Sequence, residues 1–508
     1  MVSGAVAAPH LCAREVPLVI LHTADVGGHV FSLPYREHRD HQGGLLRCAT
    51  LVDRLRQSEP HVLLVDCGGL IHGSPESLLS HGRLPIQLAR AMRYDARVPA
   101  VSEFRAGPAM VSDLEQVSRI PMLAANLRHD PALHTALPNH ARWVTKELGG
   151  VRVVITGVAS LPDPVGDDAW IPAASRKSVS EGLQEVLREV RPLRPDILVL
   201  LAHDAGPVDD ELYGSPLRRT LREFPEFDVV LLGGGSRQVV RGAREAGRVV
   251  AQAGSRARWL GRVDILYDTV NRRILSMASD VIDIGPDIPE SVDRIRERGA
   301  DLGRIRRELA AIVGHADRDI GGSSSWPGQS PMQELLSRAI RRETQADVVL
   351  LRKSYRGMLS VGEIQYSDVL RAVPNIDRLA HFRIPAADLR RVLTENADRI
   401  ASPEFLGAHG IRYTYLADAV DANTIRDLVL EDGRKPHGRR RLHIVCDASV
   451  LSPSRSGRDE LRRIAYEPTS RLMLTDIDTY KTVIDYIRAH DPIDIRAVRC
   501  MTIHSDPD

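Results

Sequence analysis

The sequence is poor in cysteine and in aromatic residues. Its 508 residues include five cysteines, and aromatic side chains make up only 4% of the chain. The cysteines are scattered and odd in number and form no C-x-x-C pair, which argues against a disulfide framework and against a zinc site built on cysteine. The shortage of aromatic rings argues against an extended platform for stacking nucleic-acid bases.

Neither a charge of one sign nor a long apolar run dominates the chain. Lys and Arg number 68 against 67 Asp and Glu, a net charge of +1, so no global field would recruit a nucleic acid or a membrane surface. No run approaches the ~20 apolar residues of a membrane span, and residues 1–16 lack the basic and apolar regions of a secretory signal. We therefore expect a soluble, cytoplasmic protein with no membrane span and no nucleic-acid partner.

The length requires more than one domain. A chain of 508 residues with 43% hydrophobic content exceeds what one hydrophobic core usually serves. A charged segment with an apolar helical stripe, residues 289–313, and a Gly- and Ser-rich joint, residues 321–328, lie between two regions of mixed pattern. We predict a flexible tail over 1–16, a first domain over 17–285, a linker helix and joint over 286–328, and a second domain over 329–508.

Short β-branched runs alternate with helical patterns in the first region. Runs this apolar indicate strands buried on both faces, and hence helices on both sides of a sheet. The predicted strands are residues 18–21, 62–65, 153–155, 197–201, 229–232, 248–252 and 258–268, and the predicted helices include 45–57 and 178–190. This alternation predicts an α/β protein whose sites lie in the loops at the carboxyl ends of the strands.

Several motifs in order along the chain resemble one family. Residues 21–29 read L-H-T-A-D-V-G-G-H, residues 43–51 read G-G-L-L-R-C-A-T-L, and residues 65–74 read V-D-C-G-G-L-I-H-G-S. Y-D-A at 94–96 precedes V-S-E-F at 101–104, and G-E-I-Q-Y-S-D-V at 362–369 precedes V-P at 373–374. Together they resemble the 5'-nucleotidase and 2',3'-cyclic phosphodiesterase family of two-domain metallophosphoesterases, over roughly residues 17–500.

The resemblance implies an α/β fold, α+β overall. Its parts would be an N-terminal metallophosphoesterase-like β-sandwich with flanking helices, a linker helix, and a C-terminal 5'-nucleotidase-type α/β domain. It also implies a pair of divalent metal ions held by Asp, Asn and His side chains. In such centres one ion activates water and both stabilise the transferring phosphoryl oxygens.

Most of the implied metal ligands are replaced in this sequence. Asp25 and His203 keep their positions, but the His of the opening motif is Gly27, the bridging Asp is Gly69 and the Asn of N-H-E is Val101. The final histidine pair falls near Gly235 and Arg237, and the His of N-H-E, which in the family helps to stabilise the transition state, is Ser102. Each ion would keep one protein ligand where stable sites use three or four. We expect no catalytic residue, no metal and no cofactor in this degenerate member.

A rebuilt single-metal site is the alternative. Asp25, His203 and the substitute His72 lie on neighbouring predicted loops and are suitable ligand types. In that case the chain is a 5'-nucleotidase-type phosphoester hydrolase that uses Mn or Zn. Otherwise Asp25 caps a turn and His203 is a partly buried, hydrogen-bonded histidine.

The nucleotide-binding half of the resemblance is altered as well. Arg356 keeps an arginine position of N-x-x-x-x-R, while the Asn is Leu351. Asp478 and Tyr480 keep two positions of the motif that contacts base and ribose, while its stacking aromatic is Leu472. Arg356, Asp478 and Tyr480 are therefore the candidates for binding a substrate or an anion.

The joint loss of metal and nucleoside positions predicts a pseudoenzyme. We expect a binding, scaffolding or regulatory subunit with a protein partner that no motif identifies. A non-hydrolysing nucleotide or phosphate sensor that uses Arg356 and Asp478 is the second alternative.

Overall fold

The computed structural model consists of two compact units, Met1–Ile305 and Arg306–Asp508. The residues that it describes are 15–32, 42–104, 107–128, 137–159, 161, 171, 175–203, 223–234, 243–245, 247–322, 329–352, 357–374, 376, 378–397, 399, 402, 405–416, 424–451, 459–497 and 501–504. Among these residues, no helix is both long enough and apolar enough to cross a membrane.

The first unit is a sandwich of two sheets. The larger sheet has the order β13-β12-β1-β2-β3-β4-β5 and comprises β1 (Glu15–Thr23), β2 (Val62–Asp66), β3 (Ala96–Arg97), β4 (Met122–Leu123), β5 (His140–Ala141), β12 (Trp259–Asp268) and β13 (Arg273–Asp283). The other has the order β10-β11-β9-β8-β7-β6 and comprises β6 (Trp143–Leu148), β7 (Val151–Val158), β8 (Ile197–Ala202), β9 (Val229–Leu232), β10 (Ala243–Glu245) and β11 (Arg248–Gln252).

Several strands that contain buried apolar runs pair in parallel within each sheet. β1 pairs in parallel with β2, and β7, β8 and β9 pair in parallel with one another. Ile20 of β1 and Leu63 of β2 share one core cluster with Ile155 of β7, Val199 of β8 and Leu231 of β9. One hydrophobic core therefore lies between the two sheets, with the carboxyl ends of the parallel strands at one edge.

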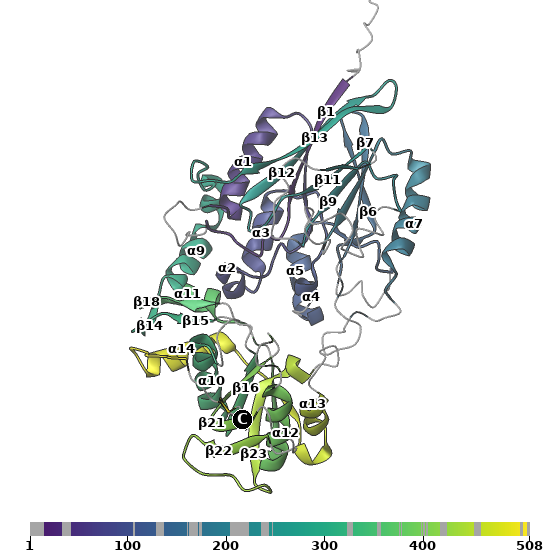
Figure 1. The fold of residues 1–508 in the computed structure, drawn as a ribbon. Helices are drawn as coiled ribbons and strands as arrows, with labels where there is room; N and C mark the ends of the chain where they lie inside the picture. The colour runs from purple at the N-terminus through teal and green to yellow at the C-terminus, as the bar shows by residue number, and fades with distance from the viewer. Residues whose placement is uncertain are drawn as a thin grey trace, which may run out of the picture. The chain divides into compact units, whose positions relative to one another are not determined.

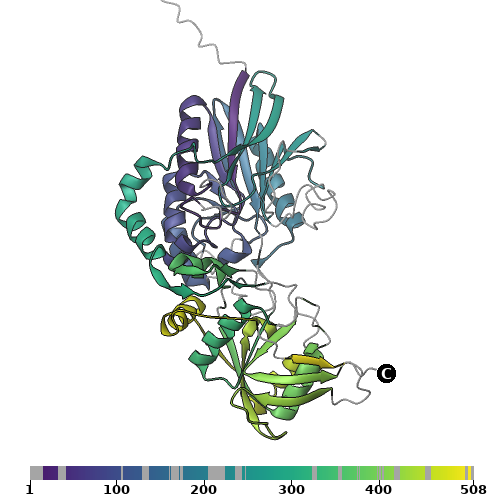
Figure 2. The ribbon, with the colours of Figure 1, turned by 60° about the vertical axis from the view of Figure 1, so that its left-hand side comes forward.

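Helices cover the outer faces of the sandwich. The helices of the first unit are α1 (Leu45–Ser58), α2 (Pro75–Leu79), α3 (Arg83–Ala91), α4 (Val101–Phe104), α5 (Gly107–Ser118) and α7 (Val179–Val190), with the 3-10 turn η2 (Arg191–Leu193). Helix α9 (Val292–Leu309) runs across the boundary between the two units at Ile305. Figures 1 and 2 show α1 and α3 along one side of the strands and α7 along the other. α7 begins at a capping box in which Ser178 and Glu181 satisfy each other's backbone N–H groups, a local signal for a helix start.

The second unit is built on a five-stranded sheet of order β20-β16-β23-β19-β24, with three small sheets, β14-β18, β15-β17 and β22-β21-β25. The strands are β14 (Ile312–Ala316), β15 (Ile320–Gly321), β16 (Val348–Arg352), β17 (Met358–Leu359), β18 (Gly362–Gln365), β19 (Arg378–Pro385), β20 (Leu406–His409), β21 (Ile411–Leu416), β22 (Ile425–Leu430), β23 (Arg441–Asp447), β24 (Met473–Asp476) and β25 (Met501–His504). The helices are α10 (Pro331–Thr344), α11 (Tyr366–Ala372), α12 (Ala386–Ala397), α13 (Asp459–Ala465) and α14 (Thr479–Ala489), with 3-10 turns η3 (Ala448–Leu451) and η4 (Pro468–Ser470).

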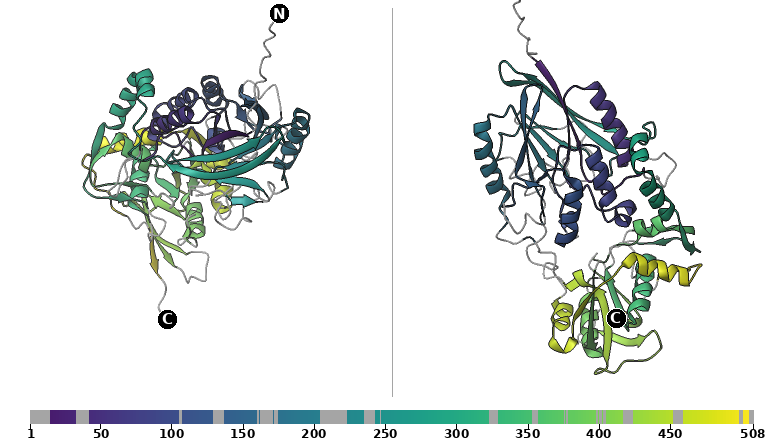
Figure 3. Two further views of the ribbon diagram at one scale, coloured as in Figure 1. Left: turned by 90° about the horizontal axis from the view of Figure 1, so that it is seen from above. Right: turned by 180° about the vertical axis from the view of Figure 1, so that it is seen from behind.

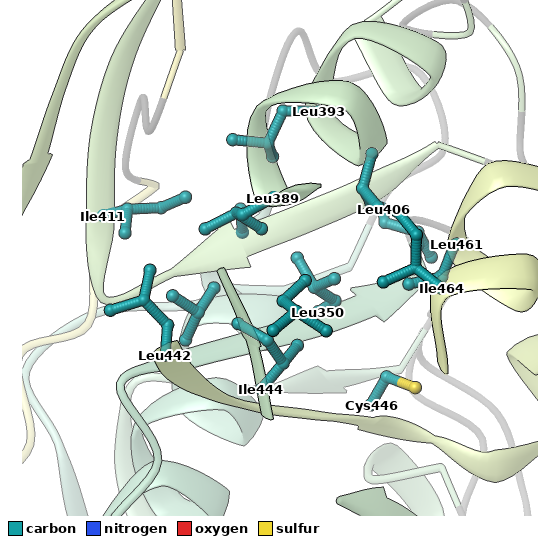
Figure 4. Close-up of a cluster of buried hydrophobic side chains, with 14 of the residues drawn as sticks. Leu350, Leu389, Leu393, Leu406, Ile411, Leu442, Ile444, Cys446, Leu461 and Ile464 are labelled. Atoms are coloured by element: carbon teal, nitrogen blue, oxygen red, sulfur yellow. The ribbon is translucent and has the colours of Figure 1, made fainter. Parts of the chain in front are cut away.

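Each face of this sheet has its own core, because successive residues of a strand point to opposite faces. Leu350 and Ile444 pack with Leu389 of α12 and Leu461 of α13 on one face, and Figure 4 shows these side chains converging from the strands and the two helices. The neighbouring strand residue Val445 packs on the other face in the cluster that includes residues of α10 and α14.

The predicted fold class is confirmed. The structure is mixed α/β with a two-sheet N-terminal sandwich and a separate C-terminal α/β unit, and the long β12–β13 hairpin of the sandwich is visible from above in Figure 3. Two boundaries differ from the prediction. Glu15 and Val16, predicted as tail, begin β1 because they pair with Asp268 and Tyr267 of β12. The charged helix ends at Leu309, and Ile312 already pairs with Gln365 in β14.

A buried ion cluster holds the segment between β3 and α5. Arg97, Glu103 and Glu115 are each less than 5% exposed. Arg97 Nη1 donates to Glu103 Oε2 at 3.1 Å, and Arg97 Nη2 pairs with Glu115. Glu103 also accepts from the backbone N–H groups of Ile71 and Ala100, each at 3.2 Å. The Glu of the N-H-E-like motif is therefore a framework residue that fixes two loops.

Removing one carboxylate from this cluster should be costly. We expect Glu115→Ala to lower the free energy of unfolding by about 3–5 kcal/mol, because it leaves the Arg97 guanidinium buried with one carboxylate fewer. Asp113→Ala on the same helix is the matched control, since Asp113 pairs with Arg83 at the surface and such pairs contribute about 1 kcal/mol or less. Urea unfolding of both variants measures the difference, and equal losses would contradict the buried-cluster assignment.

Candidate functional site

The candidate site lies where four strands of the sandwich end. β1 and β2 end at Thr23 and Asp66 in the larger sheet, and β8 and β9 end at Ala202 and Leu232 in the other. The loops that follow these strands bring Asp25, Gly68, His203 and Gly234 within contact distance of one another. This is the edge at which the pattern of buried strands predicted a site.

The structure brings the two retained ligand positions together directly. His203 Nε2 lies 3.1 Å from Asp25 Oδ1, and the Gly234 N–H donates to Asp25 Oδ2 at 2.8 Å. The Asp25 N–H donates to the Gly68 carbonyl at 2.8 Å. Asp25 has a φ of 48°, in the left-handed region that Asp tolerates. Both carboxylate oxygens therefore already have protein partners.

Glycine is required around this pair. A Cβ on Gly68 would lie 2.5 Å from the His203 ring. Gly69 has a φ of 72°, and a Cβ there would lie 3.1 Å from both Cα and Oδ1 of Asp25. The family resemblance implies a bridging aspartate at Gly69. Here the Gly69 backbone lies so close to Asp25 that little room is left for a side chain.

The residues present do not fit the two-metal centre that the resemblance implies. Gly27, Gly69 and Val101 offer no side-chain donor, and Asp25 and His203 are hydrogen-bonded to each other. Gly235 and Arg237, where the last histidine pair was expected, lie outside the described residues. Two donors are fewer than the three or four that a stable site uses for one ion.

His72 does not complete a metal site with Asp25 and His203. Among the residues that the structure describes, no group of three or more His, Cys, Asp or Glu side chains is placed to hold a metal ion. Burial lowers the pKa of His72, and the charged groups that act on it are Glu103 and Arg97 rather than Asp25. His72 therefore stays a predicted substitute ligand, and the structure does not group it with Asp25 and His203 among the residues that it describes.

A buried hydrogen-bond network lies next to the site and includes Asp66, the last residue of β2. Thr23 Oγ1 lies 2.7 Å from Asp66 Oδ2 and 3.0 Å from the Tyr94 hydroxyl, and the Gly68 N–H donates to Asp66 Oδ1 at 2.9 Å. Burial raises the pKa of Asp66 to about 8. Asp66 is therefore a protonated acid at neutral pH and is no anionic metal ligand.

His22 is a second buried titratable group in the same region. Its ring is fully buried in β1, and a Cβ on Gly261 of the neighbouring strand would lie 2.1 Å from His22 Nε2. Burial lowers the pKa of His22 to about 4. The first His of the opening motif is thus a neutral core residue. Its only sequence signal was its place inside an apolar strand.

Of the three candidates for nucleotide binding in the second unit, Asp478 and Tyr480 lie among the described residues. Arg356 lies outside the described residues. Asp478 caps α14, since its Oδ1 accepts from the Lys481 N–H at 2.9 Å, and Tyr480 packs partly buried against the core of that unit. Arg352, at the end of β16, donates to Asp447 Oδ2 at 3.0 Å at the end of the parallel strand β23. Its charge is therefore neutralised within the protein.

The chain is similar in sequence to one family profile and to several known proteins. Residues 312–443 match the profile of the 5'-nucleotidase, C-terminal domain. The snake venom 5'-nucleotidase of Crotalus adamanteus is 25% identical over 311 residues, which are 56% of this chain and 51% of that protein. The chain thus spans about half the length of this relative. Protein UshA of Yersinia enterocolitica is 22% identical over 440 residues, 76% of this chain and 77% of that one.

The fold has solved counterparts over nearly the whole chain. The crystal structure of a 5'-nucleotidase precursor from Thermus thermophilus superposes with a TM-score of 0.67 at 18% identity, covering 97% of this chain and 100% of that chain. At this identity the likeness concerns the fold.

The two buried groups should give stability a specific dependence on pH. Because Asp66 binds its proton more tightly when folded, its contribution is full below pH ~4 and is lost as pH rises toward 8. His22 behaves oppositely, and its contribution is present above pH ~6.5 and lost as pH falls toward 4. The two slopes oppose each other between pH ~4.5 and 6.5.

The substitution Asp66→Asn keeps the shape of the side chain and removes its ionisable carboxyl group. We expect the wild type to lose stability between pH ~6.5 and 8, by at most about 1.4 kcal/mol per pH unit, and the variant to lose this slope. Between pH ~4.5 and 6.5 the variant should gain stability with pH relative to the wild type, because it lacks the opposing Asp66 contribution and keeps that of His22. Urea unfolding across this range measures both slopes, and parallel curves for the two proteins would refute the assignment.

Proposed function

We propose that this chain, which belongs to the two-domain 5'-nucleotidase family, acts as a binding or regulatory subunit and not as a two-metal hydrolase. The proposal rests on the Asp25 carboxylate. Its two oxygens are engaged by His203 and by the Gly234 amide. The neighbouring positions Gly27, Gly69 and Val101 carry no donor side chain.

Hydrolysis of the family's kind needs two ions ~4 Å apart around a shared anion. An ion entering between Asp25 and His203 would have to replace a protein hydrogen bond, and it would gain only two protein ligands. The cost of dehydrating a divalent cation is repaid by a full donor set. Asp25 and His203 alone therefore do not fit a metal-assisted hydrolytic step at this position.

The framework supports a binding role. The buried cluster of Arg97, Glu103 and Glu115 and the glycine contacts around His203 keep the loops of the site in place. Well-fixed loops at the carboxyl edge of a sheet are a common place for recognition. The proposed occupant is a protein partner, with a nucleotide or phosphate held near Arg356 and Asp478 as the second possibility. The cytoplasmic location expected from the sequence remains a prediction.

The alternative is a metal-dependent phosphoester hydrolase, as the names of the relatives suggest. It is favoured by the retention of Asp25 and His203 side by side. The other positions at which the family has metal ligands argue against a hydrolase, because Gly27, Gly69 and Val101 have no side chain that could bind a metal.

Activity measurements separate the proposals. We expect purified protein incubated with Mn²⁺ to hydrolyse AMP and 4-nitrophenyl phosphate no faster than its Asp25→Ala and His203→Ala variants, because no ion is held at this position. Metal-dependent turnover that disappears in both variants would establish the hydrolase. Thermal stabilisation by AMP without turnover, lost in Arg356→Ala, would instead favour the nucleotide sensor.

Restoring the family's aspartate should damage the fold without restoring chemistry. We expect Gly69→Asp to cost about 1–3 kcal/mol more than Gly150→Asp in urea unfolding, because the new side chain meets Asp25. Gly150 is the matched control, since its φ of 84° gives a similar backbone penalty while a Cβ there meets nothing within 4 Å. Equal losses, or Mn²⁺-dependent hydrolysis gained by Gly69→Asp, would count against the proposal.

A further inference from the structure

A loop rich in positive charge connects β22 to β23 in the second unit. Residues 433–441 read G-R-K-P-H-G-R-R-R and contain five Lys and Arg residues and no Asp or Glu. The two acids that precede them are engaged within the protein, since Glu431 pairs with Arg341 and Arg434 Nε donates to Asp432 Oδ2 at 2.6 Å. These two carboxylates therefore balance Arg341 and Arg434.

The later cations of the loop have no carboxylate partner. Among the residues that the structure describes, the side chains of Lys435, Arg439 and Arg440 make no hydrogen bond or ion pair. Lys435 and Arg439 are exposed, and Arg440 is half-buried. Arg441 Nη2 donates to two backbone carbonyls. Its charge is therefore oriented by the backbone without being paired with an acid.

Two more arginines lie beside the loop. Arg441 is opposite Pro385 and two residues along from Arg383 on β19, so Arg383 and Arg441 share one face of the sheet. Arg441 also bonds the carbonyl of Thr469, two residues before Arg471. Arg383 and Arg471 are exposed, and in the described part of the chain neither side chain has an ion-pair partner. The basic patch comprises Lys435, Arg439, Arg440, Arg441, Arg383 and Arg471.

The acids that act on this region are fewer than its cations. Asp347 acts on Arg434 and on His443, and its Oδ2 accepts from the His443 N–H at 2.8 Å. Asp432 is influenced by Arg440, but its carboxylate is already bonded to Arg434. The six cations of the basic patch outnumber these two carboxylates, so the patch keeps a positive potential that attracts anions.

Backbone hydrogen bonds fix the loop on helix α12. The carbonyls of Gly438 and Arg440 accept from the N–H groups of Ala387 and Ala386, at 3.2 and 2.9 Å, and the Arg440 N–H donates to the His437 carbonyl at 2.9 Å. The two alanine amides belong to the first turn of α12 and would otherwise lack a partner within the helix. The loop backbone is therefore ordered before a ligand arrives, which lowers the entropy cost of binding.

The composition of the basic patch suits carboxylates on a protein. Five of its six cations are arginines, whose planar guanidinium groups bind a carboxylate through two parallel hydrogen bonds. Binding of single-stranded nucleic acid relies on aromatic rings for stacking, and residues 431–441 contain none. Binding at a membrane surface relies on apolar side chains that insert, and the one apolar side chain of the loop, Pro436, is buried.

We propose that the basic patch binds an acidic segment of a protein partner through ion pairs with Asp and Glu side chains. The inference rests on the binding function proposed above and names the chemistry of the partner. All residues of the patch belong to the second unit. Because the ion pairs would form at the surface, salt should weaken them.

The test is fluorescence anisotropy of a labelled oligoglutamate peptide with the full-length chain. We expect saturable binding that weakens severalfold as NaCl rises from about 50 to about 200 mM, and no binding of the matching oligoglutamine peptide. Arg439→Gln/Arg440→Gln should weaken binding about three- to tenfold, because two surface ion pairs are lost. The matched control Arg54→Gln/Arg307→Gln removes the same charge from exposed arginines of α1 and α9 and should leave the affinity unchanged.

Two competitors identify the class of anion. Poly(U) RNA and vesicles of phosphatidylcholine with phosphatidylserine should displace the peptide less well than unlabelled oligoglutamate does. Tighter binding of either competitor that is lost in Arg439→Gln/Arg440→Gln would overturn the acidic segment in favour of a nucleic acid or a membrane. Equal peptide affinities of the two double variants, or no binding by the wild type, would overturn the patch itself. Failure of the proposed binding function is distinguishable, because it appears as Mn²⁺-dependent hydrolysis of AMP and not as a change in peptide affinity.

Discussion

The Asp25 carboxylate joins the two sheets of the sandwich at the edge where their parallel strands end. Asp25 follows β1 of one sheet, while His203 and Gly234 follow β8 and β9 of the other. A metal pair would make this connection through several ligands, but here one carboxylate makes it through two hydrogen bonds. The backbone at Gly68 and Gly69 lies close to the same pair, since a Cβ on Gly68 would lie 2.5 Å from the His203 ring and one on Gly69 would lie 3.1 Å from Asp25.

Burial controls the chemistry of the groups around this contact. Asp66 keeps its proton and His22 remains neutral because each would otherwise carry an isolated charge in the core. The buried Arg97 guanidinium, in contrast, is compensated by its ion pairs with Glu103 and Glu115. The region is therefore rich in titratable residue types, while both oxygens of the Asp25 carboxylate already have hydrogen-bond partners within the protein.

Sequence reasoning was successful where the signal was local. The apolar runs located β1, β2, β7, β8, β9, β11 and β12, and the order of the motifs led to the correct fold class. Asp25 and His203 were singled out as remnants of one site, and they do meet. His72 was grouped with them because its loop is adjacent in the chain, but a loop position does not fix the direction of a side chain.

The amino-acid sequence by itself determined the alternation of strands and helices, the division into two regions, and the absence of donor side chains at Gly27, Gly69 and Val101. These properties depend on residue type and short-range pattern alone. Only the tertiary structure decided that Asp25 bonds to His203, that Asp66 holds a proton, and that Arg97 forms buried ion pairs with Glu103 and Glu115. Such contacts depend on strand register and burial, which arise when remote segments pack against one another.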